Sequence, residues 1–230
     1  MQKIIAISQQ KGGAGKSTIA ASLAIAMRQK GLRVAVLDID PQESLTSWYN
    51  ARKKFVGKEG PDITFVSLSS LWGLRIEIER TKNSHDIVII DCPPHTKSEA
   101  KTAVKEADIV LIPMQPSPAD LWATTSTLEL ALRENGNTFV ILNRVTYGTN
   151  IAKQFMEDLP TSHVISSIGN RVCFASSMSE GRTVTETEPY GKAAKEINEL
   201  TDKVLEKLAN TKPKARFVKA DATKLHEVAN

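Results

Sequence analysis

Short runs of consecutive apolar residues alternate with helical stretches along this chain, and the alternation restricts its fold more than any other feature. Most runs are apolar at successive positions, as is typical of strands that helices cover on both faces of a parallel sheet. The runs occupy residues 3–8, 33–39, 63–68, 86–92, 108–114, 138–145 and 164–168. We therefore predict a doubly wound α/β fold with a mostly parallel sheet of about seven strands.

Two of the intervening stretches carry clear helical signals. Residues 15–30 are rich in Ala, Leu and Ile and end at Gly31, and apolar side chains recur every three or four residues over 191–209. This periodicity then stops, and residues 210–230 contain a proline and more basic than acidic side chains. We predict one domain over residues 1–209, followed by a basic, flexible tail over 210–230.

Composition excludes several classes of protein. No apolar run approaches the roughly 20 residues of a membrane helix, and the N-terminal apolar stretch is too short for a signal peptide, so we expect a cytoplasmic protein. Cys92 and Cys173 form no C-x-x-C pair, which argues against a disulfide framework or a zinc site. The net charge of +4 lies mostly in the tail. Any affinity for nucleic acid must therefore come from a local basic patch or from the tail.

The segment QKGGAGKST, residues 10–18, lies between the first predicted strand and the first predicted helix. Its glycines let the backbone N–H groups converge on a phosphate, and the following helix adds the positive end of its dipole. In such a loop Lys16 reaches the β- and γ-phosphates, and the Ser17 hydroxyl ligates Mg²⁺. The other predicted nucleotide contacts are Gly12, Gly13, Ala14, Gly15 and Thr18. The segment thus predicts a P-loop that binds a nucleoside triphosphate.

Carboxylates stand at the ends of two predicted strands. Asp38 and Asp40 end the second strand, and Asp91 ends the fourth, at the sheet edge where ligands bind in such folds. Asp91 resembles a Walker B aspartate, which holds Mg²⁺. Capping of the next helix is the alternative for each acid, and for Asp38 it is as strong as a functional role.

A second lysine, Lys11, opens the loop, and residue 10 is Gln where the common P-loop has Gly. The resulting K-G-G-x-G-K-S/T pattern resembles the deviant Walker A loop of the ParA/MinD group of ATPases. This resemblance implies a homodimer with ATP between its subunits, in which Lys11 contacts the partner's nucleotide. It also implies that Asp40, within a D-x-D-P-Q motif, orients the attacking water and shares the Mg²⁺ site with Ser17 and Asp91.

Three further segments are similar to the same family. Residues 38–48, DIDPQESLTSW, are similar to small plasmid-type members without an N-terminal DNA-binding domain. Asp120 ends a stretch like the family's P-x-x-P-S-P-x-D loop and is either functional or a helix cap. Asn143 stands where relatives read the adenine edge with an amide, with a turn asparagine as the alternative. We do not expect His95 to be a general base, because phosphoryl transfer depends more on positioning and charge stabilisation.

The resemblance also implies a function. ATP-bound dimers of the family bind DNA without sequence preference and associate with the nucleoid, and a ParB-like partner stimulates hydrolysis during segregation of plasmid or chromosomal DNA. The candidate DNA contacts are Arg171, Arg182, Lys192 and Lys195, with a solvated helix face as the alternative. Positioning of a protein cargo, such as a chemoreceptor cluster or a carboxysome, remains open. A MinD-like membrane-bound division regulator is supported poorly by the lysine-rich tail, so no membrane partner is expected.

Overall fold

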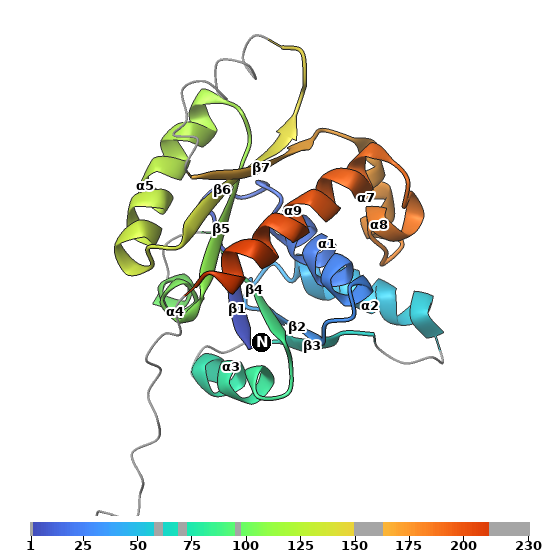
Figure 1. Ribbon diagram of the computed structural model, residues 1–230, viewed down its shortest axis with the longest axis horizontal. Coiled ribbons are helices and arrows are strands. Elements are labelled where there is room, and N and C mark those ends of the chain that lie inside the picture. Colours follow the sequence, from blue (N-terminus) through green and yellow to red (C-terminus); the bar gives the residue numbers. More distant parts are fainter. Residues whose placement is uncertain (1, 58–61, 69–72, 95–97, 150–162, 212–230) are drawn as a thin grey trace, which may run out of the picture.

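The computed structural model describes residues 2–57, 62–68, 73–94, 98–149 and 163–211 (Figure 1). The predicted tail beyond residue 211 lies outside these residues, and so does His95, which we do not expect to act as a general base. The strands are β1 (Lys3–Ile7), β2 (Val34–Asp38), β3 (Thr64–Ser67), β4 (Ile87–Asp91), β5 (Ile109–Met114), β6 (Thr138–Val145) and β7 (Val164–Gly169). They form a 7-stranded sheet in the order β3-β2-β4-β1-β5-β6-β7. Every described pairing is parallel, which confirms the predicted fold class.

Helices lie on both sides of the sheet (Figure 1). One side carries α1 (Lys16–Gln29), α2 (Ser44–Val56), α7 (Val172–Ser179), α8 (Val184–Thr187) and α9 (Lys192–Ala209). The other side carries α3 (Leu74–Lys82), α4 (Ser98–Glu106) and α5 (Pro118–Glu134). The helices predicted over residues 15–30 and 191–209 are therefore confirmed as α1 and α9.

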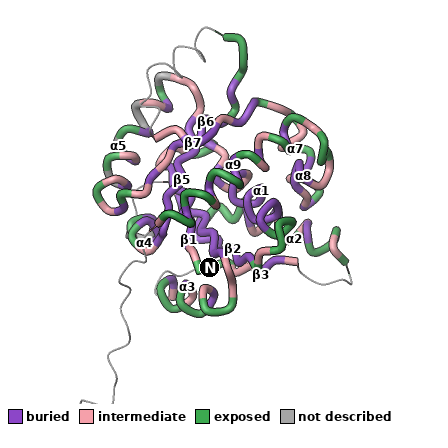
Figure 2. The backbone as a smooth tube through the Cα atoms, viewed as in Figure 1, coloured by how far each residue is buried: buried purple, intermediate pink, exposed green. Residues whose placement is uncertain are grey.

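Both faces of the central strands are buried, which explains why the strands are apolar at successive positions. In β1, Ile5 and Ile7 pack with α1 and α9, whereas Ile4 and Ala6 pack with the helices of the opposite face. Figure 2 shows this buried sheet between helices whose outer surfaces are exposed.

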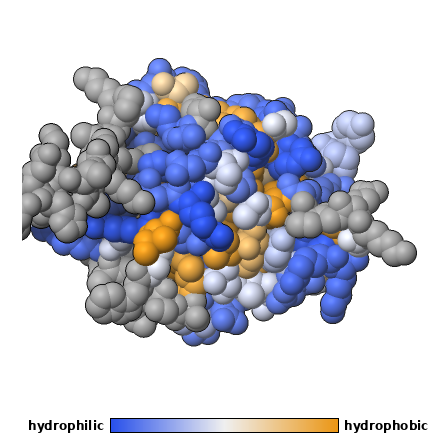
Figure 3. Space-filling model, turned by 90° about the horizontal axis from the view of Figure 1, so that it is seen from below, coloured by the Kyte–Doolittle hydropathy of each residue, from blue (hydrophilic) through white to orange (hydrophobic). Residues whose placement is uncertain are grey.

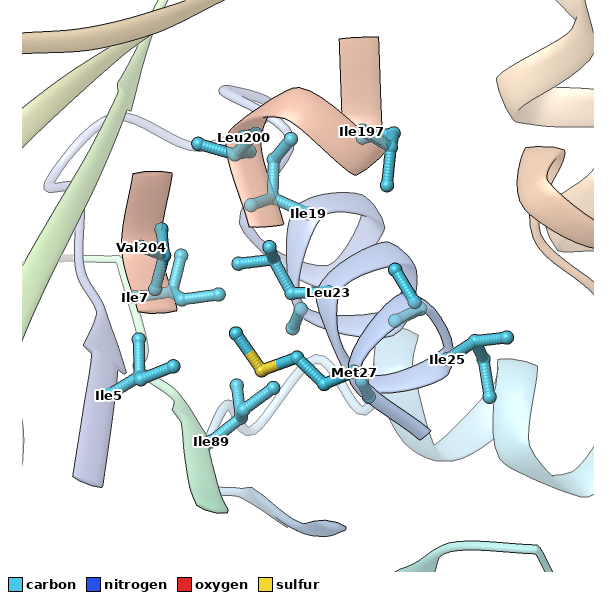
Figure 4. Packing of buried hydrophobic residues seen from close by; sticks show 14 of the residues in the cluster. Ile5, Ile7, Ile19, Leu23, Ile25, Met27, Ile89, Ile197, Leu200 and Val204 are labelled. Atoms are coloured by element: carbon cyan, nitrogen blue, oxygen red, sulfur yellow. The ribbon is translucent and has the colours of Figure 1, made fainter. Parts of the chain in front are cut away.

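The larger hydrophobic cluster joins α1 to the sheet and to α9 (Figure 4). Leu23 and Met27 of α1 and Val204 of α9 lie next to Ile5 and Ile7 of β1 and Ile89 of β4, whereas Ile25 lies on the side of α1 away from these strands. The packed helical residues are Ile19, Leu23, Ile25 and Met27 of α1 and Ile197, Leu200 and Val204 of α9. This packing fixes α1, and with it the loop that precedes α1, over the middle of the sheet.

A buried arginine anchors α2 to α8 and to Gly181, which precedes α8. Arg52 pairs with Asp62 and with Glu186, the latter at 2.9 Å, and donates to the Gly181 carbonyl at 3.0 Å. The backbones of Gly181 and Arg52 approach closely, since a Cβ on Gly181 would lie 2.1 Å from the backbone nitrogen of Arg52. These contacts hold the helix that follows Asp40 in a fixed place.

The face of the molecule in Figure 3 is largely hydrophilic, with hydrophobic side chains in small patches. None of the helices in the described ranges combines the length and the apolar character that a membrane span requires.

Candidate nucleotide and metal site

The predicted P-loop connects the carboxyl end of β1 to the N-terminus of α1. Gly13 and Gly15 have positive φ angles of 75° and 95°, a region that favours glycine. Gly15 is the N-cap of α1, and no acidic residue lies in the first turn of the helix. The first-turn amides and the helix dipole therefore favour an anion at this end of α1.

Asn143, at the end of β6, is bonded directly to the loop. Its Nδ2 donates to the Ala14 carbonyl at 2.8 Å, and its Oδ1 accepts from the Arg144 amide at 3.0 Å. An amide side chain can donate twice and accept twice, so one N–H and one lone pair remain for a ligand such as the adenine edge. The sequence did not predict the contact with the loop.

Replacing Gly15 with alanine is expected to weaken nucleotide binding by about 100-fold, because backbone strain and a steric clash act together. A Cβ at this position would lie 2.3 Å from Asn143 Nδ2. Isothermal titration with ATP checks the effect. Gly31→Ala is the matched control, since Gly31 also has a positive φ but has nothing within 4 Å of an added Cβ. Equal ATP affinities of the two variants would contradict the proposed role of Gly15.

Ser17 and Asp91 meet below the loop. The Ser17 hydroxyl donates to Asp91 Oδ2 at 2.7 Å, and Asp91 is completely buried at the carboxyl end of β4. Burial raises the pKa of Asp91 to about 7, and the nearby Asp38 and Asp40 carboxylates act in the same direction, while Ser17 and Lys16 oppose the shift. Asp91 Oδ1 has no hydrogen-bond partner within the described part of the chain.

These residues fit a magnesium ion. Mg²⁺ retains several waters and takes one or two carboxylates from a protein, so a hydroxyl and a carboxylate suffice. The unpaired Asp91 Oδ1 is an oxygen ligand that a cation would satisfy, and positive charge there would favour the carboxylate form. Other metal centres are built from three or more His, Cys, Asp or Glu side chains. The described residues contain no group of this kind that could hold a metal ion.

The two aspartates at the end of β2 differ in their contacts. Asp38 accepts from the backbone amide of Thr46 at 2.9 Å and from its hydroxyl at 2.7 Å, which anchors the first turn of α2. Burial is also the main cause of its raised pKa. Asp40 accepts from the Gln42 amide at 3.0 Å, and its own amide donates to Asp38 at 3.0 Å. Asp38 therefore positions the loop that carries Asp40.

Lys11 forms an ion pair within its own chain. Its Nζ lies 2.6 Å from Asp120 Oδ2, with the side chain of Lys11 38% exposed and that of Asp120 2% exposed. Ser117 caps α5, accepting from the Asp120 amide at 3.2 Å and donating to its carboxylate. Asp120 Oδ1 has no hydrogen-bond partner among the described residues. The cap of α5 is therefore Ser117 and not Asp120, whose carboxylate holds Lys11; a functional role of Asp120 stays a prediction.

Gln9 is a residue of the site that sequence reasoning missed. The buried Gln9 amide donates to the Pro113 carbonyl at 3.1 Å and to the Thr124 hydroxyl at 2.8 Å, and it accepts from Thr127 at 3.2 Å. These bonds attach the start of the loop to the end of β5 and to α5. The only sequence signal was a polar side chain directly after an apolar strand.

A hollow of about 280 Å³ opens beside the loop. Its lining includes Gly15, Thr18, Asn143, Gly169, Arg171 and Phe174. Two residues near the site have a positive φ although they are not glycine. Arg144, which also lines the hollow, has a φ of 55°, and Glu43, which follows the Asp40 segment, has a φ of 52°. Strained backbone of this kind is concentrated at functional sites. The hollow is therefore the candidate place for the nucleoside part of a nucleotide.

The four candidate DNA contacts have different surroundings. Arg171 pairs with Glu196, which raises the pKa of Arg171. Arg182 donates to the Glu186 carbonyl at 3.0 Å and lies over the Phe55 ring. Lys192 is exposed, and the Lys195 side chain is 78% exposed, with its Nζ 4.0 Å from Glu199 Oε1. The exposed lysines are therefore better placed for an external anion than the two arginines.

Comparison with known proteins gives consistent similarities. A family model described as the CobQ/CobB/MinD/ParA nucleotide binding domain matches residues 5–184. The chain is 29% identical over 211 residues to "Maintenance of carboxysome distribution protein A" of Halothiobacillus neapolitanus. This alignment covers 87% of this chain and 95% of the relative. It is also 35% identical over 135 residues to "Protein ParA" of Rhizobium radiobacter, in an alignment that covers 57% of each protein. A crystal structure of a plasmid partition protein from Borrelia burgdorferi B31 bound to AMPPNP has a TM-score of 0.72, with 22% identity over 90% of this chain and 100% of that chain.

Proposed function

Since the chain belongs to the CobQ/CobB/MinD/ParA family of nucleotide-binding domains, we propose that it is a Mg²⁺-dependent ATPase of the ParA type. In this proposal two subunits enclose ATP, and the ATP-bound dimer binds DNA without sequence preference. A ParB-like partner then stimulates hydrolysis, which releases the dimer and drives segregation of plasmid or chromosomal DNA. The protein is associated with the nucleoid only in its ATP-bound state.

The pairing of Ser17 with Asp91 is the observation that carries this proposal. A hydroxyl and a buried carboxylate with an unpaired oxygen lie at the base of a glycine loop, where triphosphate-bound Mg²⁺ is expected. Mg²⁺, when bound, neutralises negative charge on the phosphates. Lys16 stabilises charge on the γ-phosphate, and Asp40 orients the water whose oxygen attacks the γ-phosphorus. The bond from phosphorus to the β–γ bridging oxygen breaks, and ADP and phosphate are released.

The ion pair of Lys11 supports a switch between monomer and dimer. In the family resemblance, this lysine contacts the nucleotide of the partner subunit, whereas here it pairs with Asp120 of its own chain. Lys11 cannot make both contacts with full strength, so the pair with Asp120 opposes dimer formation. ATP supplies the competing negative charge.

Replacing Asp120 with asparagine is therefore expected to tighten ATP-dependent dimerisation by about two- to thirtyfold, because each of the two subunits loses one partly exposed ion pair. Asparagine keeps the size of the side chain and an oxygen that can accept from the Ser117 hydroxyl. Sedimentation velocity with ATP over a protein concentration series measures the effect. Asp202→Asn, which removes the surface pair with Lys30, is the matched control and should leave dimerisation unchanged. Weaker dimerisation of the Asp120 variant would mean that Asp120 holds Lys11 in its productive position.

Positioning of a protein cargo is a second candidate function. The relative from Halothiobacillus neapolitanus, 95% of which is covered by the alignment, is named for carboxysome distribution. Both functions use the same ATPase cycle and DNA binding. They differ in the partner that stimulates hydrolysis.

The ATPase cycle is tested by measuring phosphate release and dimerisation with Mg²⁺-ATP, with Mg²⁺-ADP and with ATP plus excess EDTA. The proposal expects slow hydrolysis that requires Mg²⁺ and a dimer only with ATP. A dimer of the same strength without nucleotide, or hydrolysis that EDTA leaves unchanged, would overturn it. Stimulation by a purified DNA-bound partner, against stimulation by a cargo adaptor, then separates the two functions.

A further inference from the structure

Two carboxamide side chains donate hydrogen bonds to successive carbonyl groups of the P-loop. Gln115, which directly follows β5, donates from Nε2 to the Gly13 carbonyl at 3.3 Å. Asn143, in β6, donates from Nδ2 to the Ala14 carbonyl at 2.8 Å. In the sheet, β5 and β6 follow one another on the same side of β1. We call Gln115 and Asn143 the carboxamide clamp.

The carboxamide clamp determines the direction of two N–H groups of the loop. In a planar trans peptide group, the C=O and the N–H point in opposite directions. The Gly13 carbonyl shares a peptide group with the Ala14 N–H, and the Ala14 carbonyl shares the next one with the Gly15 N–H. Because the clamp holds both carbonyls, it turns the N–H groups of Ala14 and Gly15 away from itself.

These two N–H groups are available to a ligand. Neither donates a hydrogen bond to any residue within the described ranges, although Ala14 is completely buried and a buried N–H group is normally paired. Gly13 and Gly15 have positive φ angles, whereas Ala14 between them does not. Such an alternation makes successive N–H groups converge on an anion. A phosphate oxygen is therefore the acceptor that suits the Ala14 and Gly15 amides.

A loop of this composition needs support from outside. Glycine reaches the required φ angles but is also the most flexible residue, and ordering a flexible loop on a ligand costs conformational entropy. A Cβ added to Gly12 or Gly13 would meet no atom within 4 Å, so packing does not restrain this part of the loop. The carboxamide clamp consists of the chain's own side chains and needs no nucleotide to form. It therefore reduces the entropy that is lost when a ligand binds.

We propose that Gln115 and Asn143 are positioning residues, which preorganise the Ala14 and Gly15 amides for the phosphates of a nucleotide. This role rests on the proposed function, because its ligand is a nucleoside triphosphate. It gives Asn143 a task that does not depend on the base, and it gives a task to Gln115, to which the sequence assigned none. Carboxamides suit the role because they donate without a net charge that the phosphates would attract.

Affinity measurements test each half of the carboxamide clamp. Gln115→Met and Asn143→Leu keep the approximate size of the side chain and remove the donor. In isothermal titration with AMPPNP and Mg²⁺, Gln115→Met should weaken binding by about three- to tenfold. Asn143→Leu should weaken it by about ten- to fiftyfold, because its shorter bond satisfies the carbonyl of a buried residue. Gln29→Met, at the exposed end of α1, is the matched control and should bind like wild type.

Tripolyphosphate separates positioning of the loop from recognition of the base. This probe, used with Mg²⁺ in competition with AMPPNP, carries phosphates but no adenine. Gln115→Met should weaken tripolyphosphate and AMPPNP by the same factor. Asn143→Leu should also weaken tripolyphosphate, by at least about fivefold. If Asn143 served only to read adenine, tripolyphosphate affinity would not change.

The dynamics of the loop provide a readout that a merely structural role would not move. Backbone ¹⁵N relaxation of the nucleotide-free protein should give order parameters near about 0.85 for the Ala14 and Gly15 amides on the ps–ns timescale. Gln115→Met should lower the Ala14 value and Asn143→Leu the Gly15 value, each to below about 0.6. Because Gln115 is only half-buried, Gln115→Met should leave the free energy of unfolding in urea almost unchanged.

The outcomes distinguish this inference from the proposed function. If wild-type protein binds neither AMPPNP nor tripolyphosphate, the proposed function itself fails. If wild-type protein binds both, but the two variants bind them within twofold of wild type, the positioning role is wrong while the function stands. Order parameters of Ala14 and Gly15 that stay at the wild-type values in both variants would also overturn it.

Discussion

Replacing Lys16 with glutamine is expected to weaken ATP binding by at least about 100-fold and to abolish ATP-dependent dimerisation. Lys16 is buried at the first position of α1, close enough to Asp91 to oppose the rise in its pKa. The substitution removes a charge-assisted bond to phosphate and leaves a neutral amide in its place, a loss of about 3 kcal/mol. Isothermal titration with ATP measures the affinity, and sedimentation velocity measures the dimer.

Lys30→Gln is the control for this variant. It makes the same chemical change at the opposite end of α1, where Lys30 pairs with Asp202 on the surface. This control should bind ATP like the wild-type protein. ATP binding by Lys16→Gln within threefold of wild type would show that the loop does not hold the triphosphate in the proposed way.

Replacing Asp40 with alanine is expected to reduce hydrolysis by about 100- to 10,000-fold, while the ATP-bound dimer persists. The Gln42 amide fixes one oxygen of this carboxylate, so the side chain is oriented before any ligand binds. Positioning of water matters for hydrolysis and not for ATP affinity, which should change little. Single-turnover phosphate release and sedimentation with ATP measure the two properties separately.

The neighbouring aspartate provides the control for Asp40. Asp38→Asn keeps the shape of the side chain but weakens its bonds to Thr46, so it should destabilise the protein more than it slows hydrolysis. Chemical denaturation measures this stability. Hydrolysis at the normal rate by Asp40→Ala would mean that another group positions the water.

The sequence predicted the fold well because its strongest signals are local. Runs such as residues 87–90 are apolar at every position, and a buried parallel strand is the structure that satisfies such a run. The glycine loop was placed correctly between β1 and α1 for the same reason, since its position depends only on the two elements that flank it.

Contacts between distant segments were outside the reach of the sequence. The bonds of Gln9 to α5 and of Asn143 to the P-loop join residues more than a hundred positions apart, and no local pattern records them. Arg171 illustrates the same limit. The sequence shows a basic residue, but only the fold shows that Glu196 engages it.

The most direct test of ATP-dependent DNA binding measures how tightly the purified protein binds a random-sequence DNA duplex with ATP, with ADP and without nucleotide. Each measurement is made at two salt concentrations, and binding to liposomes is measured in parallel. The account predicts DNA binding with ATP only, weakened strongly at the higher salt concentration, because lysine contacts to phosphate release counterions. It predicts no liposome binding in any state. Liposome binding with ATP while DNA is ignored in every state would contradict it and would instead support a membrane-bound regulator.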